Sequence, residues 1–199
     1  MKTASIGRIA SGSAMVMVAG LASVQGAALA ASVLQSRDAG AWLGAALGLW
    51  LGALAADGLT GLVHWACDTW GDESTPWLGP TLIHAFREHH RDPQAMLAHH
   101  PLDVSREPMI AAAVALAALC FTPARGLLEL HPAAHGFLWS LSVYGAAANQ
   151  LHFWAHAPRI PRPVRLLQRL RLVLSSEAHQ RHHAAPNTRG YCISTGWLN

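Results

Sequence analysis

The chain has 199 residues, which is room for a single domain over residues 1–199, and a formal charge of +3 at pH 7. Charged residues make up 13% and hydrophobic residues 52%, a balance that argues against a disordered chain and favours a lipid bilayer. The basic residues are spread between apolar segments and form no single basic face, which excludes nucleic acid as the expected partner. Three cysteines without a C-x-x-C pair exclude a complete disulfide framework.

Four apolar segments are expected to cross a membrane as helices: residues 9–34, 39–65, 109–121 and 136–153. The first contains no charged residue, and a cleaved signal peptide is the alternative interpretation of it. The second is interrupted by Asp57. The third is short and is followed by Pro123, so three spans with one re-entrant piece also fit. We therefore expect an all-α, multi-pass membrane bundle of about four spans.

The placement of lysine and arginine predicts how these spans are oriented. With four spans, one side of the membrane receives two basic residues near the N-terminus, three in the loop 66–107 and seven after residue 157. The other side receives only Arg37 and Arg125. The positive-inside rule therefore places the C-terminal tail in the cytoplasm. The alanine-rich composition suggests a bacterial chain, and hence an inner membrane.

The segment 163–176 combines aliphatic side chains with arginines, which predicts a helix that lies on the membrane surface. Arg165 and Arg169 in this segment are candidates for binding lipid phosphate. A general positive-inside role explains them more simply and is the favoured interpretation.

Nine of the 13 histidines fall in four groups on the predicted cytoplasmic side. The groups are His64 with Asp68; His89, His90 and His99; His152 with His156; and the H-x-x-H-H pattern of His179, His182 and His183. Residues four apart share one face of a helix, so the paired side chains point the same way. One zinc ion takes about four ligands, so nine histidines are too many for one tetrahedral site. Two metal ions fit the number, and two neighbouring iron ions bind and cleave O₂ and attack an unactivated C–H bond.

Two acidic residues need separate interpretation. Asp68 is either a metal ligand or a partner that orients the imidazole of His64. Asp57 is costly to bury in a membrane and so is a functional candidate, although a hydrogen bond to Thr60 or to a backbone group is favoured. The following histidines lack partners at ligand spacing and are interpreted as ordinary polar residues: His84, His131 and His135.

Two other classes of protein remain open at this point. One is a non-catalytic metal-binding membrane protein, and the other is an electron-transfer bundle that carries haem. Haem needs only one or two histidines per group and would leave most of the grouped histidines unexplained. The sequence carries no nicotinamide or flavin fingerprint, so an oxidative enzyme would need electrons from a separate partner.

Five stretches of the chain resemble the Kua / CarF family of lipid desaturases. They read GLVHW followed by DTWG, then FREHHRDP, NQLHFWAH, HQRHH and YCISTGWLN, in residues 61–71, 86–93, 149–156, 179–183 and 191–199. The resemblance covers residues 55–199, and the stretches keep the family's order. Residues 1–54 hold the N-terminal spans and show no family signal.

The resemblance implies a helical membrane bundle with a cytoplasmic, histidine-ligated di-iron site. The plasmalogen-forming members convert the 1-O-alkyl chain of an ether phospholipid to a vinyl ether, with O₂ as co-substrate and two electrons from a separate donor. Such a donor would be a cytochrome b5 or a ferredoxin. A fatty-acyl desaturase and a lipid hydroxylase with the same metal site are the alternatives. The implied iron ligands are all nine grouped histidines: His64, His89, His90, His99, His152, His156, His179, His182 and His183.

One loop departs from the family pattern. The family has R-H-D-F-x-E-x-N after the paired histidines, whereas residues 98–105 read AHHPLDVS. His99 keeps its place, and Asp103 stands for the glutamate, which makes it a further possible ligand or supporting carboxylate beside Asp68. Because this loop would help to shape the substrate site, it leaves the identity of the lipid open.

Overall fold

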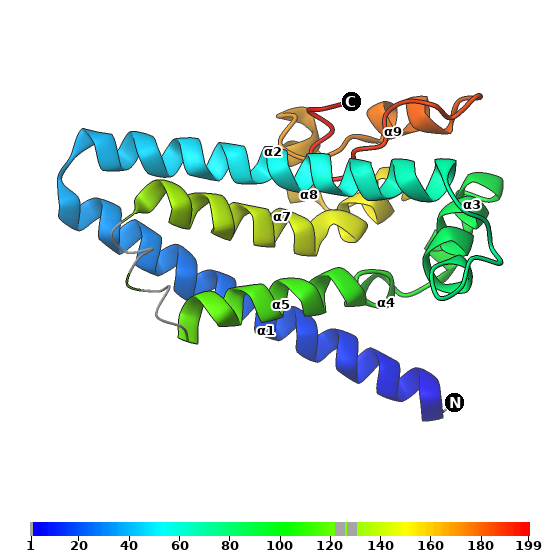
Figure 1. Cartoon of the computed structure of the whole chain (residues 1–199), viewed down its shortest axis with the longest axis horizontal. Coiled ribbons are helices and arrows are strands. Elements are labelled where there is room, and N and C mark those ends of the chain that lie inside the picture. The colour runs from blue at the N-terminus through cyan, green and yellow to red at the C-terminus, as the bar shows by residue number, and fades with distance from the viewer. Residues whose placement is uncertain (1, 122–125, 127–130) are drawn as a thin grey trace. The chain divides into compact units, whose positions relative to one another are not determined.

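The computed structural model describes residues 2–121, 126 and 131–199, and within these ranges the regular structure is helical (Figure 1). Pro123 and Arg125, which entered the predictions of span end and orientation, lie outside the described residues. The chain divides into two compact units, each described by itself below. The first comprises Met1–Ala56 with Ser105–Ala148, and we call it the apolar unit. The second comprises Asp57–Val104 with Asn149–Asn199, and we call it the histidine unit.

The four apolar segments predicted as spans are all helical. They lie in α1 (Lys2–Ser36), α2 (Ala39–Thr69), α5 (Arg106–Phe121) and α7 (Pro132–His156). Within the described residues, two helical stretches are long and apolar enough to cross a membrane, Ile9–Ser36 and Ala39–Thr69. Long runs of alanine, leucine and glycine with few charged residues explain these helices, since every backbone group can be satisfied within the helix.

The break between α1 and α2 has a local cause. Arg37 adopts a positive φ of 48°, a conformation that no helix continues. The Oδ1 atom of Asp38 then accepts a hydrogen bond from the Gly40 N–H at 3.0 Å, which caps the start of α2. The polar pair between the two apolar runs therefore ends one helix and begins the next.

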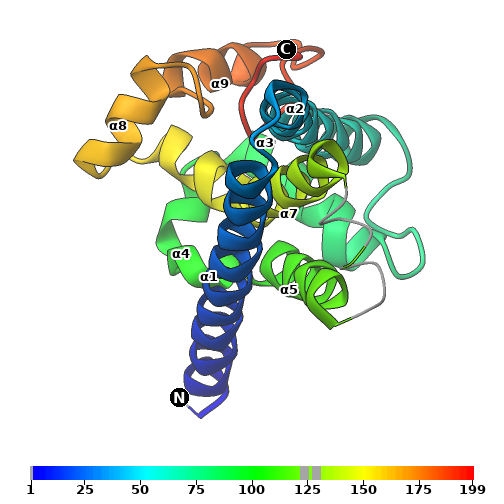
Figure 2. The same ribbon diagram turned by 90° about the vertical axis from the view of Figure 1, so that its left-hand side faces the viewer.

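Helices of the apolar unit approach each other closely at small residues. Gly44, Gly48 and Gly52 recur every four residues on α2, and a Cβ at Gly48 would overlap the carbonyl of Ala133 on α7. A Cβ at Gly52 would overlap the carbonyl of Phe137 in the same way. Such small-residue stripes let helix backbones pack against each other in membranes. Helices α1 and α5 also pack side by side in this unit (Figures 1 and 2).

Polar side chains inside the apolar unit are paired with each other. His135 is buried, and its Nε2 atom lies 2.7 Å from the Oε1 atom of Gln25. The Gln25 amide donates in turn to the sulfur of Cys120 at 3.2 Å, and the indole of Trp139 donates to the Ala22 carbonyl at 2.7 Å. His135 is thus a hydrogen-bonded histidine of the bundle interior.

Besides the C-terminal parts of α2 and α7, the histidine unit is built from short helices. They are the π-helix η1 (Gly79–Ile83), α3 (His84–Arg91), the 3-10 helix η2 (Ala95–Ala98), α4 (Pro101–Val104), α8 (Arg162–Arg169) and α9 (Ser176–His183). Ser175 caps α9, since its hydroxyl oxygen accepts a hydrogen bond from the Ala178 N–H at 3.2 Å.

The predicted surface helix over 163–176 is shorter in the structure, because α8 ends at Arg169. Arg171 has a positive φ of 56°, and the chain after it leaves the helix. Leu174 is fully buried, and its N–H donates to the carbonyl of Ser194 at 2.9 Å. Packing against the C-terminal segment therefore replaces the last turns of the expected helix, while Leu166 and Leu170 on its first part stay exposed.

The C-terminal segment is held by the carboxylate of Asp57, which is 0% exposed. Its Oδ1 atom accepts hydrogen bonds from the N–H groups of Thr195 and Gly196 at 2.7 and 2.9 Å, and its Oδ2 atom accepts one from Leu198 at 3.1 Å. Three charge-assisted hydrogen bonds account for a buried carboxylate. The favoured expectation for Asp57, a hydrogen bond to a backbone group, is confirmed.

Candidate metal centre

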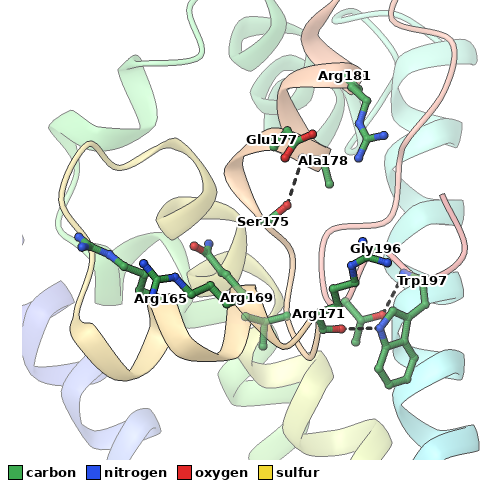
Figure 3. Close-up of a pocket in the computed structure, with 12 residues that line it drawn as sticks. Arg165, Arg169, Arg171, Ser175, Glu177, Ala178, Arg181, Gly196 and Trp197 are labelled. Carbon is green, nitrogen blue, oxygen red and sulfur yellow. Dashed lines mark hydrogen bonds between the residues drawn. The ribbon is translucent and has the colours of Figure 1, made fainter.

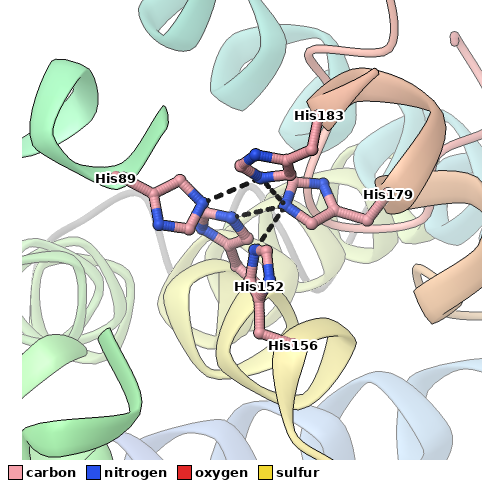
Figure 4. A group of neighbouring side chains, drawn as sticks. All are labelled: His89, His152, His156, His179 and His183. Carbon is pink, nitrogen blue, oxygen red and sulfur yellow. Dashed lines mark hydrogen bonds between the residues drawn. The ribbon is translucent and has the colours of Figure 1, made fainter. Parts of the chain in front are cut away.

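Five histidines from three helices of the histidine unit form one group: His89 on α3, His152 and His156 on α7, and His179 and His183 on α9. We call these the five-histidine group. Their candidate ligand nitrogens all lie within 4.8 Å of one another. Figure 4 shows the rings approaching from different sides with nitrogen atoms toward a common centre. The i,i+4 spacings in α7 and α9 place each pair on one helix face.

The nitrogen contacts within this group suit a cation better than a hydrogen-bond network. The Nε2 atom of His179 lies 2.8 Å from that of His152, 2.8 Å from that of His156 and 3.1 Å from that of His183. A ring nitrogen of a neutral imidazole carries at most one proton and so serves one such contact as donor. The other contacts bring lone pairs together, which a metal ion at their centre would stabilise. The residues therefore fit a metal ion.

A second group lies beside the first and contains one carboxylate: His64 and Asp68 on α2, His90 on α3 and His182 on α9. We call it the aspartate group. The Oδ2 atom of Asp68 lies 2.9 Å from Nε2 of His90 and 3.5 Å from Nε2 of His64. The Nε2 atom of His182 lies 3.1 Å from that of His64. The buried Oδ1 atom of Asp68 has no hydrogen-bond partner among the described residues, which also suits a cation.

Two backbone carbonyls fix how the aspartate group points. The Nδ1 atom of His64 lies 3.0 Å from the carbonyl oxygen of Tyr191, and Nδ1 of His182 lies 2.8 Å from that of Arg189. A carbonyl only accepts, so each Nδ1 must carry the proton and each Nε2 keeps its lone pair for the group. A carbonyl that orients a histidine through its second nitrogen is usual beside metal ions. Sequence reasoning missed these two contacts, because any residue type supplies a backbone carbonyl.

Neighbouring residues divide between the two groups. His89 and His90 are consecutive, with ring centroids 6.0 Å apart, and His182 and His183 are consecutive at 5.4 Å. One residue of each pair belongs to the five-histidine group and the other to the aspartate group. Helices α3 and α9 thus contribute to both groups, and the two candidate ion positions are adjacent.

Burial keeps several histidines of the two groups neutral. Burial first, and then the neighbouring imidazoles, lower the pKa of His89 to about 2 and that of His183 to about 3. Burial likewise lowers the pKa of His179 and His182 below the ordinary histidine value. Metal ions bind the neutral imidazole, so these four histidines are in the form that binds metal at physiological pH.

The structure brings eight of the nine predicted histidines into the two groups, together with Asp68. His99 is exposed after η2 and belongs to neither. Asp103 lies on α4, also outside both groups. His84 pairs with Glu73 at 2.9 Å, which agrees with its interpretation as an ordinary polar residue.

Two adjacent histidine-rich groups on a helical scaffold define a candidate two-metal centre. The family model for the lipid desaturase domain matches residues 53–199, which include every residue of both groups. The chain therefore belongs to the lipid desaturase family, as the sequence motifs predicted.

Similar proteins of known name support the same family assignment. The chain is 41% identical over 162 residues to plasmanylethanolamine desaturase of Myxococcus xanthus, covering 81% of this chain and 56% of that protein. It is 37% identical over 157 residues to plasmanylethanolamine desaturase 1 of Mus musculus, covering 77% and 58%. It is 36% identical over 176 residues to the chloroplastic fatty acid desaturase 4 of Arabidopsis thaliana, covering 86% and 52%. The chain thus spans little more than half the length of these relatives. No solved structure matches it.

Proposed function

We propose that this protein is an O₂-dependent desaturase of membrane phospholipids that converts a 1-O-alkyl ether lipid, plasmanylethanolamine, to the 1-O-alk-1′-enyl vinyl ether. The observation that carries the proposal is the pair of adjacent histidine groups in a chain of the lipid desaturase family. The ether-lipid substrate is supported by two relatives named plasmanylethanolamine desaturase.

Two iron ions are the proposed cofactor. The five-histidine group would hold one ion and the aspartate group the other. When bound, the iron pair supplies O₂ activation and the oxidising power needed to break an unactivated C–H bond. His99, the ninth histidine of the expected set, would have to join from outside these groups.

The balance of the reaction defines the partners. The alkyl chain gives up two hydrogen atoms as its C1′–C2′ single bond becomes a double bond. O₂ takes up four electrons and four protons and leaves as two water molecules. The lipid supplies two of these electrons, so a separate donor of the cytochrome b5 or ferredoxin type must supply the other two.

The protein's own residues prepare the site for this chemistry. His64, His179 and His182 are almost fully buried, which keeps water from the candidate ion positions. The carbonyls of Arg189 and Tyr191 hold two imidazoles in the tautomer that presents Nε2. The histidine ligands are neutral, so the carboxylate of Asp68 would be the chief negative charge that balances two bound iron ions.

We further propose that the protein is a multi-pass inner-membrane protein of a bacterium, with four spans and the metal site facing the cytoplasm. The asymmetry of lysine and arginine between the predicted loops supports this orientation. The grouped residues of α2 and α7 fall at the ends of those helices that the charge rule assigns to the cytoplasm.

Lipid mass spectrometry of a plasmalogen-free host, fed 1-O-alkylglycerol and expressing the chain, tests the proposal. A species two mass units lighter that mild acid destroys would establish vinyl-ether formation. A His156→Ala variant serves as the control that lacks a ligand. Unchanged ether lipids with about two irons per purified chain would move the search to acyl chains or hydroxylation, for which the 36% identical fatty acid desaturase is the precedent. Unchanged lipids without iron would refute an enzymatic role.

A further inference from the structure

A cavity of about 940 Å³ opens on the histidine unit, away from the candidate ligands. Arg165 and Arg169 of α8, Arg171 after it and Arg181 of α9 line it, together with Trp197 of the C-terminal segment (Figure 3). The volume suits a small-molecule group rather than a single ion.

The four arginines lack acidic partners. Within the part of the chain that the structure describes, none of them has a carboxylate oxygen within 4.0 Å, and Glu177 is the one acidic residue that lines the cavity. Guanidinium groups gathered in a concave site repel each other unless an anion joins them, and their planar donors match phosphate oxygens. A positive-inside role requires only that these charges lie on the cytoplasmic side, so it does not explain their gathering in one cavity.

Apolar surface accompanies the arginines. Val173 and Trp197 line the cavity itself, and Leu166 and Leu170, each next in sequence to a cavity arginine, are 55% and 59% exposed outside it. A soluble phosphate ligand makes no contact with apolar surface, whereas a phospholipid brings a phosphate and apolar chains to the same place.

We propose that this cavity binds the phosphate of a phospholipid headgroup and so positions the substrate of the desaturase. The identity of the lipid as substrate rests on the proposed function, while the binding itself does not. The indole N–H of Trp197 donates to the carbonyl of Arg171 at 2.5 Å, which holds the cavity wall in place.

Helix α9 connects the cavity to the candidate metal centre. His179, His182 and His183 lie on one face of α9, and Glu177 and Arg181, four residues apart, lie on the opposite face. A helix with its side chains is about 10–12 Å wide. The reacting C1′ and C2′ atoms of an ether lipid lie only a few bonds from the phosphate, so a headgroup site must lie about one helix width from the metals.

The test compares two pairs of arginines that carry the same charge. The double variant Arg165→Gln/Arg169→Gln removes two cavity guanidinium groups, and Arg159→Gln/Arg162→Gln removes two from the neighbouring stretch that does not line the cavity. Binding of a short-chain phosphatidylethanolamine to the purified 199-residue chain in detergent is measured, with the matching diacylglycerol as the probe without phosphate. Iron content and size-exclusion profile report whether each variant is folded.

We expect the cavity variant to bind the phospholipid at least about tenfold more weakly, because charged hydrogen bonds to phosphate are lost. The control variant should change binding less than about twofold, and diacylglycerol should bind weakly to both. Equal weakening in both variants would show a general effect of surface charge and overturn the proposal. If the cavity variant does not accumulate, Arg181→Gln on α9 takes its place.

Inorganic phosphate separates the two possible sources of the anion. Competition by phosphate alone as strong as that of the phospholipid would overturn the lipid assignment in favour of a free-phosphate site. The binding assay requires no turnover, so phospholipid binding in a chain without desaturase activity would sustain the headgroup site and refute only the proposed function.

Discussion

Replacement of Asp57 tests whether the C-terminal segment orients the metal ligands. Asp57→Ala removes a fully buried carboxylate that accepts three backbone hydrogen bonds. A charged hydrogen bond contributes about 1.5–3 kcal/mol, and such bonds to one carboxylate are not additive, so we expect a loss of about 3–5 kcal/mol. Asp57→Asn keeps an oxygen for Thr195 and Gly196 but turns an NH₂ toward the N–H of Leu198. This substitution therefore removes one hydrogen bond and should lower the free energy of unfolding by about 1.5–3 kcal/mol.

Asp57→Ala should also disturb the histidines of the aspartate group. The segment that Asp57 anchors carries the carbonyls that hold Nδ1 of His182 and His64. When the segment loosens, these rings are free to turn, whereas the five-histidine group has no such support from this segment. Iron in Asp57→Ala should therefore fall from about two toward about one per chain, with loss of activity.

Iron content, thermal unfolding in detergent and lipid turnover are measured on wild type, Asp57→Ala and Asp57→Asn. Thr60→Ala is the matched control on the same helix, because the Thr60 hydroxyl donates to the backbone carbonyl of Asp57 at 2.9 Å and reaches the C-terminal segment only through a long 3.5 Å contact with the Ser194 hydroxyl. Full iron loading and full activity in Asp57→Ala would refute the reasoning. Complete inactivation of Asp57→Asn would show a direct role in the chemistry that its hydrogen bonds do not explain.

Three further predictions follow from the structure. His183→Ala should abolish lipid turnover and lower iron content, whereas His99→Ala should keep its iron because His99 lies outside both groups; iron lost from His99→Ala would show that this loop supplies a ligand. Gly48→Leu should destabilise the apolar unit by about 3 kcal/mol through overlap with α7, and Gly20→Leu, whose Cβ meets nothing within 4 Å, should destabilise it much less; equal melting temperatures would contradict the close helix contact. Metal-free protein should lose stability as pH falls from 6.5 toward about 3, since burial lowers the folded-state pKa of His89 and His183 and the unfolded chain then binds more protons. Unfolding followed across this range would show no slope if these histidines were exposed.

Local sequence patterns predict much of the fold and part of the candidate site. Long apolar runs with few charged residues predict the long helices, because a segment of that hydrophobic length has few other stable structures. The i,i+4 pairs at His152 and at His179 predict shared helix faces from geometry alone. Those faces account for the pairs within α7 and α9, which the structure brings into one group.

The rest depends on tertiary contacts that local patterns do not contain. Consecutive residues such as His89 and His90 are equivalent in sequence, and only the packing of α3 assigns them to different groups. The early end of α8 depends on the burial of Leu174 against the C-terminal segment, which lies far along the chain. The arginine cavity arises in the same way, because three separate segments contribute to its wall.

The use of main-chain oxygens to orient two imidazoles has an evolutionary consequence. A carbonyl is present whatever the side chain, so position 189 is free to vary without changing what His182 contacts. The constraint falls instead on the path of the backbone between the two oxygens, where Gly190 adopts a φ of +78° that other residues rarely reach. Among descendants of this chain, we expect drift at Arg189 and persistence of Gly190. Substituting alanine at position 190 would strain this path and place a Cβ 3.4 Å from the Cβ of His182, so it would alter metal affinity without removing a ligand atom.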